Sequence, residues 1–177
     1  MTTKIVFAGF GGQGVLTLGQ IVATIAMNKG KHVTWMPSYG AEMRGGTANC
    51  GVIISDTPIG SPIVASNMDI LVALNEASIF KFEKLLNPEG LIFANSSLIL
   101  NPIDHKNTVN IDASNIATKI GNVRVANMVM LAGFLKKTDI LTLEDVESVL
   151  NEKFGTKNPK LIPMNIEAIK EGLKELG

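Results

Sequence analysis

The chain has 177 residues, which is the length of one ordinary domain with a substantial core. Its 16 basic and 16 acidic residues leave no positive excess to neutralise phosphates, so nucleic-acid binding is not expected. One cysteine and two histidines exclude an intrachain disulfide and an iron–sulfur cluster held by four thiolates of this chain, and they argue against a zinc site.

Apolar residues make up 46% of the chain but aromatic residues only 5%, so the core must be built from aliphatic side chains and methionine. This composition suits a buried parallel sheet covered by helices, and it leaves apolar surface for a partner. No apolar run reaches the about 18 residues of a membrane-spanning helix, and no signal peptide is visible. We therefore expect residues 1–177 to form a single cytoplasmic domain that neither enters a membrane nor binds a metal.

The first half of the chain alternates apolar runs with polar, glycine-rich segments. In chain order it predicts a strand at 4–8, a glycine loop at 9–14, a helix at 15–27, a strand at 32–36, a loop at 37–46 and a strand at 47–55. A proline-containing turn at 56–58 is followed by an apolar segment, 59–64. We predict that this segment returns as the second arm of a hairpin.

The second half begins with a continuous apolar run and ends with helical patterns. It predicts strands at 69–74, 91–94 and 109–111, and helices at 76–86, 113–120, 126–136, 143–154 and 164–176. Residues 87–90 should stop the first of these helices, and Thr142 with Asp145 should cap the fourth. Strands that alternate with helices predict a three-layer, Rossmann-like α/β domain with a mostly parallel sheet and an antiparallel hairpin.

The glycine loop has the pattern G-x-G-x-x-G. Its candidate binding residues are Gly9, Gly11, Gly12, Gln13 and Gly14. It lies between a predicted strand and a predicted helix, where backbone N–H groups and the helix dipole favour a bound phosphate. A nicotinamide dinucleotide site also needs an acidic residue near the end of the second strand, and residues 33–37 contain none, which argues against NAD(P). The structural alternative is that the glycines only let the strand and the helix pack tightly.

The loop after the second strand is the other candidate binding segment. Its candidate site residues are Ser38, Tyr39, Glu42, Arg44, Gly45 and Gly46. It should leave the sheet at the same edge as the glycine loop, and Arg44 could bind a carboxylate or a phosphate. Alternatively, a Glu42–Arg44 ion pair only holds the loop in shape. Neither loop contains a nucleophile beside a base, so we assign no catalytic residue. We expect Cys50 to be an inert buried thiol and the two histidines to be structural or exposed.

Five segments of the sequence form a recognisable set. They are Gly9-Phe-Gly-Gly-Gln-Gly14, Pro37-Ser-Tyr-Gly-Ala-Glu-Met-Arg-Gly-Gly46, Val52-Ile-Ile-Ser55, Pro58-Ile-Gly-Ser-Pro62 and Gly121-Asn-Val-Arg-Val-Ala-Asn-Met128. Together they resemble the gamma subunits of 2-oxoacid:ferredoxin oxidoreductases over nearly the whole chain, and the string S-x-G-x-E-x-R-G-G is the most specific part. The branch that acts on 2-oxoglutarate or on branched-chain 2-oxoacids such as ketoisovalerate is the most similar.

The resemblance implies a reaction that needs several chains. The whole enzyme decarboxylates a 2-oxoacid on thiamine diphosphate, passes electrons through iron–sulfur clusters to ferredoxin and transfers the acyl group to coenzyme A. In this family alpha and beta subunits hold thiamine diphosphate, and beta or delta subunits hold the clusters. A role in anaerobic metabolism beside alpha, beta and delta partners is therefore implied, and the isolated chain should be inactive.

The resemblance also implies a ligand for the two loops. Coenzyme A carries a pyrophosphate and a ribose phosphate, which the glycine loop and Arg44 could bind. The alternative use of these loops is docking onto the alpha subunit. Two further functions stay open, a free-standing dinucleotide-binding protein and a non-catalytic scaffold subunit. The apolar surface would also allow the isolated chain to form a homodimer.

Overall fold

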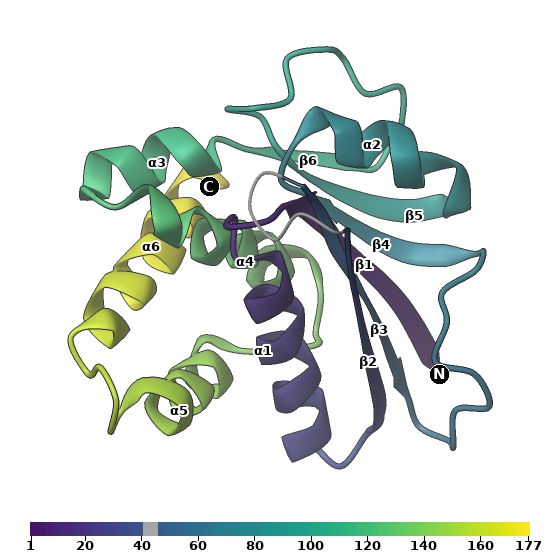
Figure 1. The fold of residues 1–177 in the computed structure, drawn as a ribbon, viewed down its shortest axis with the longest axis horizontal. Helices are drawn as coiled ribbons and strands as arrows, with labels where there is room; N and C mark the ends of the chain where they lie inside the picture. The colour runs from purple at the N-terminus through teal and green to yellow at the C-terminus, as the bar shows by residue number, and fades with distance from the viewer. Residues whose placement is uncertain (41–45) are drawn as a thin grey trace.

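The computed structural model describes residues 1–40 and 46–177, and within them the strands form one mixed sheet (Figure 1). The strands are β1 (Thr2–Phe10), β2 (His32–Tyr39), β3 (Thr47–Ser55), β4 (Met68–Ala73), β5 (Leu86–Asn95) and β6 (Thr108–Ile111). Their order across the sheet is β2-β3-β1-β4-β5-β6. The β1–β4, β4–β5 and β5–β6 pairs are parallel, whereas β3 is antiparallel to both of its neighbours. The predicted fold class is confirmed.

The antiparallel hairpin exists, but it is formed by β2 and β3 and not by the segment that was expected to follow β3. The prediction that residues 59–64 return as a strand was wrong. Both edges of β3 are already occupied, one by β1 and the other by β2, so no edge is left for another strand. Pro58 and Pro62 also lack the N–H groups that such a strand would need.

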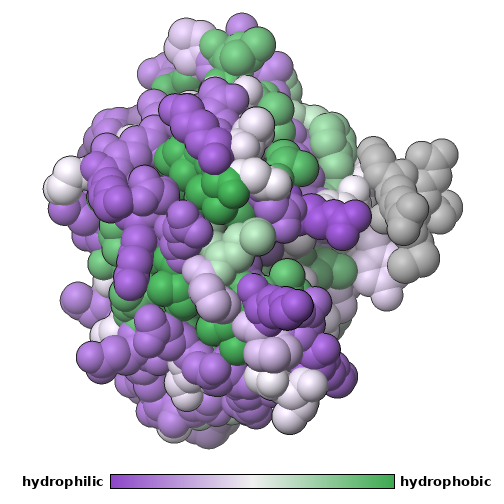
Figure 2. All heavy atoms as spheres, turned by 90° about the vertical axis from the view of Figure 1, so that its left-hand side faces the viewer, coloured by the Kyte–Doolittle hydropathy of each residue, from purple (hydrophilic) through white to green (hydrophobic). Residues whose placement is uncertain are grey.

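One face of the sheet is covered by five of the helices (Figure 1). These are α1 (Val15–Asn28), α3 (Ala113–Ile120), α4 (Ala126–Lys137), α5 (Leu143–Phe154) and α6 (Leu161–Glu175). Helix α1 packs on β1, β2 and β3, and α4 packs on β5 and β6. Helices α5 and α6 lie outside them, and the surface over α3, α5 and α6 is mostly hydrophilic with apolar patches between (Figure 2). The expected capping box of α5 is present, because Thr142 and Asp145 cap each other's backbone N–H.

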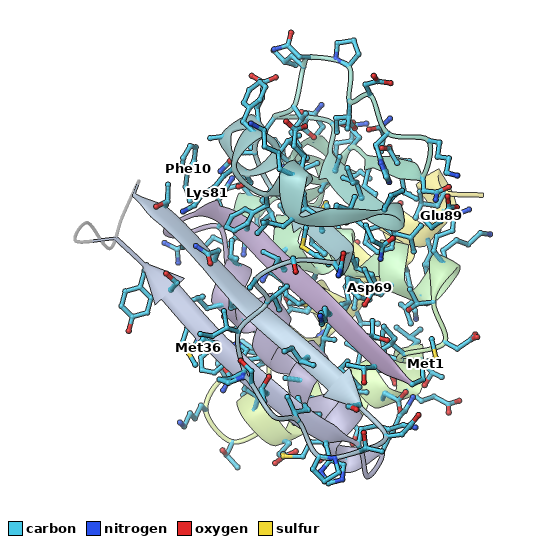
Figure 3. All side chains as sticks on the ribbon, turned by 90° about the vertical axis from the view of Figure 1, so that its right-hand side faces the viewer. Met1, Phe10, Met36, Asp69, Lys81 and Glu89 are labelled. Atoms are coloured by element: carbon cyan, nitrogen blue, oxygen red, sulfur yellow. The ribbon has the colours of Figure 1, made fainter. Side chains whose placement is uncertain are left out.

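The opposite face is only partly covered. Helix α2 (Glu76–Phe82) and the segment after β5 pack there on β1, β4 and β5. Over β2 and β3 the described residues place no helix, and Met36 points outward from β2 with 43% of its surface exposed (Figure 3). The helix expected at 76–86 is shorter because a 3-10 turn, η1 (Glu83–Leu85), ends it and β5 begins at Leu86.

Residues 87–90 therefore belong to β5 and not to a helix stop. Pro88 is tolerated in this strand because the β4–β5 register shifts between Met68 and Ile70, which is the kind of irregularity where a residue without an N–H fits. None of the helices in the described part of the chain is long and apolar enough to cross a membrane.

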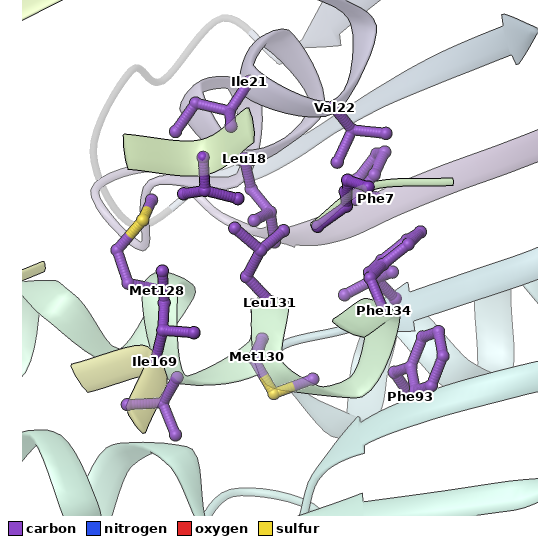
Figure 4. Close-up of a cluster of buried hydrophobic side chains, with 14 of the residues drawn as sticks. Phe7, Leu18, Ile21, Val22, Phe93, Met128, Met130, Leu131, Phe134 and Ile169 are labelled. Atoms are coloured by element: carbon purple, nitrogen blue, oxygen red, sulfur yellow. The ribbon is translucent and has the colours of Figure 1, made fainter. Parts of the chain in front are cut away.

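The main core lies between the sheet and α1 and α4 (Figure 4). Three phenylalanines form its centre: Phe7 of β1, Phe93 of β5 and Phe134 of α4, all with 0% exposure. The Phe134 ring centroid lies 5.7 Å from that of Phe7 and 5.1 Å from that of Phe93. Gly133 makes this approach possible, since a Cβ there would lie 2.6 Å from the Phe93 ring. These rings fix α4 on the sheet.

Replacement of Phe134 by Ala should lower the free energy of unfolding by about 3–5 kcal/mol, because it removes a fully buried ring and leaves a cavity. Urea denaturation followed by circular dichroism measures this loss. The matched control is Phe80→Ala in α2, where the ring is 62% exposed and the change should stay within about 0.5 kcal/mol. Equal losses in the two variants would contradict the assignment of Phe134 to the core.

Candidate functional site

The two candidate loops leave the sheet side by side. Strands β1 and β2 run in the same direction because each pairs antiparallel with β3, so the chain leaves both at the same end of the sheet. Phe10 lies opposite Thr47, and Tyr39 lies opposite Ala48. The N–H of Gly11 donates a hydrogen bond to the carbonyl of Gly46 at 2.8 Å, which joins the glycine loop directly to the end of the second loop.

The glycine loop has the backbone of an anion-binding turn. Gly12 and Gly14 have φ angles of 99° and 73°, which side chains other than glycine rarely adopt. The N–H of Gln13 donates to the Phe10 carbonyl at 3.1 Å, whereas the N–H groups of Gly12 and Gly14 find no acceptor among the described residues. Helix α1 begins directly afterwards, so its dipole adds partial positive charge at this point.

A shallow hollow of about 430 Å³ opens beside this turn. Its described walls are Phe10, Gly11, Gly12, Gly14, Val15, Leu16, Thr17, Tyr39 and Ala48. None of these wall residues carries a charge. An anion that entered here would therefore be held by backbone N–H groups, and the apolar walls would suit the less polar part of a ligand.

The structure separates the candidate residues of the glycine loop into two groups. Gly11, Gly12 and Gly14 line the hollow. Gly9 does not, and its lack of a side chain is needed for packing, because a Cβ there would lie 2.7 Å from both Gln13 Oε1 and the Val15 side chain. Gln13 also turns away from the hollow, and its Oε1 accepts the Phe10 N–H at 2.6 Å.

The candidate residues of the second loop are only partly described. Tyr39 is 60% exposed and lines the hollow. Ser38 is exposed, but its side chain lies on the opposite face of β2 from Tyr39 because strand residues alternate. Gly46 contributes its carbonyl to Gly11. The other three candidates, Glu42, Arg44 and Gly45, lie outside the described residues.

Asparagine side chains behind the loop were missed in the sequence. Asn127, the second residue of α4, is 6% exposed and donates from Nδ2 to the Gly14 carbonyl at 3.2 Å. Gly14 must be glycine at this contact, because a Cβ would collide with the Asn127 carboxamide. The one sequence signal for this contact was an asparagine within the otherwise apolar run that forms α4. The run itself forms a core helix, since Met128 and Met130 are buried.

The thiol of Cys50 is a structural group. It is 0% exposed beneath α1, and its Sγ lies 3.8 Å from the Val15 carbonyl, to which it donates. Burial raises the pKa of this thiol to about 12. His32 is exposed at the start of β2, and His105 contacts the Gly90 carbonyl through Nε2 at 2.7 Å. In the described ranges, no group of three or more His, Cys, Asp and Glu side chains could hold a metal ion.

These features define a class of protein: a Rossmann-like α/β domain whose glycine loop and neighbouring hairpin share one end of the sheet. The family model for pyruvate ferredoxin/flavodoxin oxidoreductase matches residues 4–175. The chain therefore belongs to this family of oxidoreductase domains.

Three proteins illustrate the relationship. Subunit VorA of the ketoisovalerate oxidoreductase of Methanothermobacter thermautotrophicus is 37% identical over 171 residues, which are 96% of this chain and 35% of VorA. Subunit KorC of the 2-oxoglutarate synthase of Methanocaldococcus jannaschii is 31% identical over 171 residues, covering 92% of this chain and 90% of KorC. The crystal structure of a keto/oxoacid ferredoxin oxidoreductase gamma subunit from Geobacter sulfurreducens has a TM-score of 0.79 at 28% identity, covering 97% of this chain and 96% of that one. The chain spans about a third of the length of the VorA proteins.

Cys50 should resist alkylation in the folded protein. Its raised pKa keeps the thiol protonated at pH 8, and a buried, protonated thiol is a poor nucleophile. Mass spectrometry after incubation with iodoacetamide should find the native chain unmodified and the urea-unfolded chain carrying one adduct. Labelling of the native chain at the unfolded rate would show that the thiol is accessible.

Proposed function

We propose that this chain is the gamma subunit of a multi-subunit 2-oxoacid:ferredoxin oxidoreductase. Such an enzyme converts a 2-oxoacid and coenzyme A into acyl-coenzyme A and carbon dioxide while ferredoxin is reduced. The observation that carries the proposal is the family match over residues 4–175, together with the near-complete mutual coverage with KorC. Residues 1–177 would act in the cytoplasm as one domain of that assembly.

The substrate of the assembly is proposed to be a branched-chain 2-oxoacid or 2-oxoglutarate. The support is that a ketoisovalerate oxidoreductase subunit and a 2-oxoglutarate synthase subunit are both more than 30% identical to this chain. Thiamine diphosphate and the iron–sulfur clusters would lie on alpha, beta and delta partners. A single cysteine in the whole chain supports this division, because a cluster needs several thiolates.

The glycine loop is proposed to assist in binding coenzyme A. Its residues fit a pyrophosphate, because no atom lies within 4 Å of the place where a Gly12 side chain would be, and because the N–H groups of Gly12 and Gly14 have no acceptor among the described residues. Arg44 would supply a full positive charge to the same ligand. A dinucleotide cofactor is not favoured, since β2 ends in Pro37-Ser38-Tyr39 without an acidic residue for a ribose.

Docking onto sister subunits is supported by the edge strand β2. The N–H of Gly40 donates to the Thr47 carbonyl, and pairing alternates along an antiparallel ladder, so Val33, Trp35 and Tyr39 direct their backbone groups away from β3. Residues 33–40 carry no charge, although exposed strand edges are usually protected by charges, and Pro37 is the outward position without an N–H. Trp35, Met36 and Tyr39 are exposed on this edge by 37%, 43% and 60%.

An uncharged edge with exposed apolar side chains suits an extended segment of a partner chain. We assign it to a sister subunit of the same oxidoreductase. In the absence of that subunit, the same edge would allow the isolated chain to form a homodimer.

The isolated chain should show no 2-oxoacid-dependent reduction of a viologen dye. Addition of the proposed alpha, beta and delta partner chains should produce dye reduction that depends on both the 2-oxoacid and coenzyme A. A complex prepared without this chain is the control, and it should have much lower activity. Full turnover by the single purified chain would disprove the proposal.

Replacement of Arg44 by Ala in the reconstituted complex should raise the KM for coenzyme A roughly ten-fold, because a charge-assisted hydrogen bond to phosphate is lost. Assembly, measured by size-exclusion chromatography, should be unchanged. Lys84→Ala is the matched control, since Lys84 is exposed in η1 at the opposite end of the sheet. An unchanged KM in Arg44→Ala would favour a scaffold subunit.

A further inference from the structure

Four uncharged carboxamide side chains form hydrogen bonds to the glycine loop or to the turn beside it. They are Gln13, Asn75, Asn95 and Asn127. The three asparagines are 5%, 1% and 6% exposed, which is unusual for side chains that lose hydrogen bonds to water on burial. Each asparagine is therefore expected to have a specific hydrogen-bond partner. These partners lie in the turns that follow β1 and β4.

Gln13 is the centre of this network. Its Oε1 accepts the Phe10 N–H at 2.6 Å and the Asn75 Nδ2 group at 3.1 Å. Its Nε2 lies 3.5 Å from the Leu74 carbonyl at the end of β4. The side chain of a loop residue thus bonds to the last residue of its own strand and to the turn after the neighbouring strand.

The other carboxamides extend the same network. Asn75 Oδ1 accepts the Ser78 N–H at 3.0 Å and caps α2. Asn95 Nδ2 donates to the Leu74 carbonyl at 3.2 Å and to Ser114 Oγ at 2.9 Å, close to the start of α3. Asn127 holds the Gly14 carbonyl from the side of α4. Hydrogen bonds of these side chains therefore connect the glycine loop and the turn after β4 to the starts of α2, α3 and α4.

We infer that Gln13 is a positioning residue, which holds the glycine loop from inside so that the N–H groups of Gly12 and Gly14 remain directed away from the core. It does not contact the ligand, because it is not part of the hollow's walls. An amide suits this role because it both accepts and donates while staying neutral. A carboxylate at this point would place negative charge at the start of α1 and oppose an anion. What the loop binds rests on the proposed function; how the loop is held does not.

The test uses the full chain with Gln13→Met, which keeps the side-chain length and removes the hydrogen bonds. Backbone ¹⁵N relaxation should give order parameters of about 0.85 for Gly11, Gly12 and Gly14 in the wild-type chain. In the variant these order parameters should fall to about 0.6. Gln20→Met is the matched control, since Gln20 is exposed on α1, and it should leave these amides rigid. Unchanged loop order parameters in Gln13→Met would overturn the inference.

A second variant separates positioning from general destabilisation. Asn75→Ser keeps an oxygen that can cap α2 but removes the Nδ2 donor to Gln13. It should also loosen the loop, and the double variant should be no looser than Gln13→Met alone, because both changes break one interaction. Additive effects of the two substitutions, or a rigid loop in Asn75→Ser, would count against the network.

In the reconstituted complex, Gln13→Met should raise the KM for coenzyme A roughly five-fold with kcat at saturating coenzyme A unchanged, as expected when a binding loop loses its preferred shape. The two readouts have different meanings. A loosened loop with an unchanged KM would support the positioning role and reject coenzyme A as the ligand of this loop. A rigid loop would reject the positioning role whatever the KM.

Discussion

The central constraint in this molecule is the antiparallel strand β3 between β1 and β2. It makes β1 and β2 run in the same direction without being neighbours, so the glycine loop and the hairpin loop leave the sheet together. The hydrogen bond from Gly11 to Gly46 is the direct result. Helix α1 then begins directly after the glycine loop and packs on β1, β2 and β3.

Much of the fold could be predicted from local patterns. Central strands such as β1 and β4 contain short, continuous apolar runs, and the start of α5 follows from its Thr142–Asp145 capping box. Pairing partners could not be predicted, because they depend on which strand edges are free. Segment 59–64 has the composition of a strand, yet β3 had no edge left to pair with it. Residues 87–90 look like a turn, but an irregular β4–β5 register admits them to a strand.

The candidate site was predictable only in outline. The glycine spacing and its place between a strand and a helix predicted the loop, and Gly12 and Gly14 do adopt conformations that favour glycine. The direction of the Gln13 side chain was not predictable, because its partners, Asn75 and Leu74, come from another strand–helix turn. Asn127 lies 113 positions from Gly14, so no local pattern connects them. Long-range polar contacts of this kind depend on the assembled core.

The contact between Asn127 and Gly14 determines when the glycine loop can reach its final geometry during synthesis. The glycine loop is made early during synthesis, but one of its restraints belongs to α4, which emerges more than a hundred residues later. A nascent chain that ends before α4 would therefore carry the sequence motif without its finished geometry, since closing such a distant contact must wait for the second half of the domain. The final shape of the glycine loop thus depends on a helix from the second half of the domain.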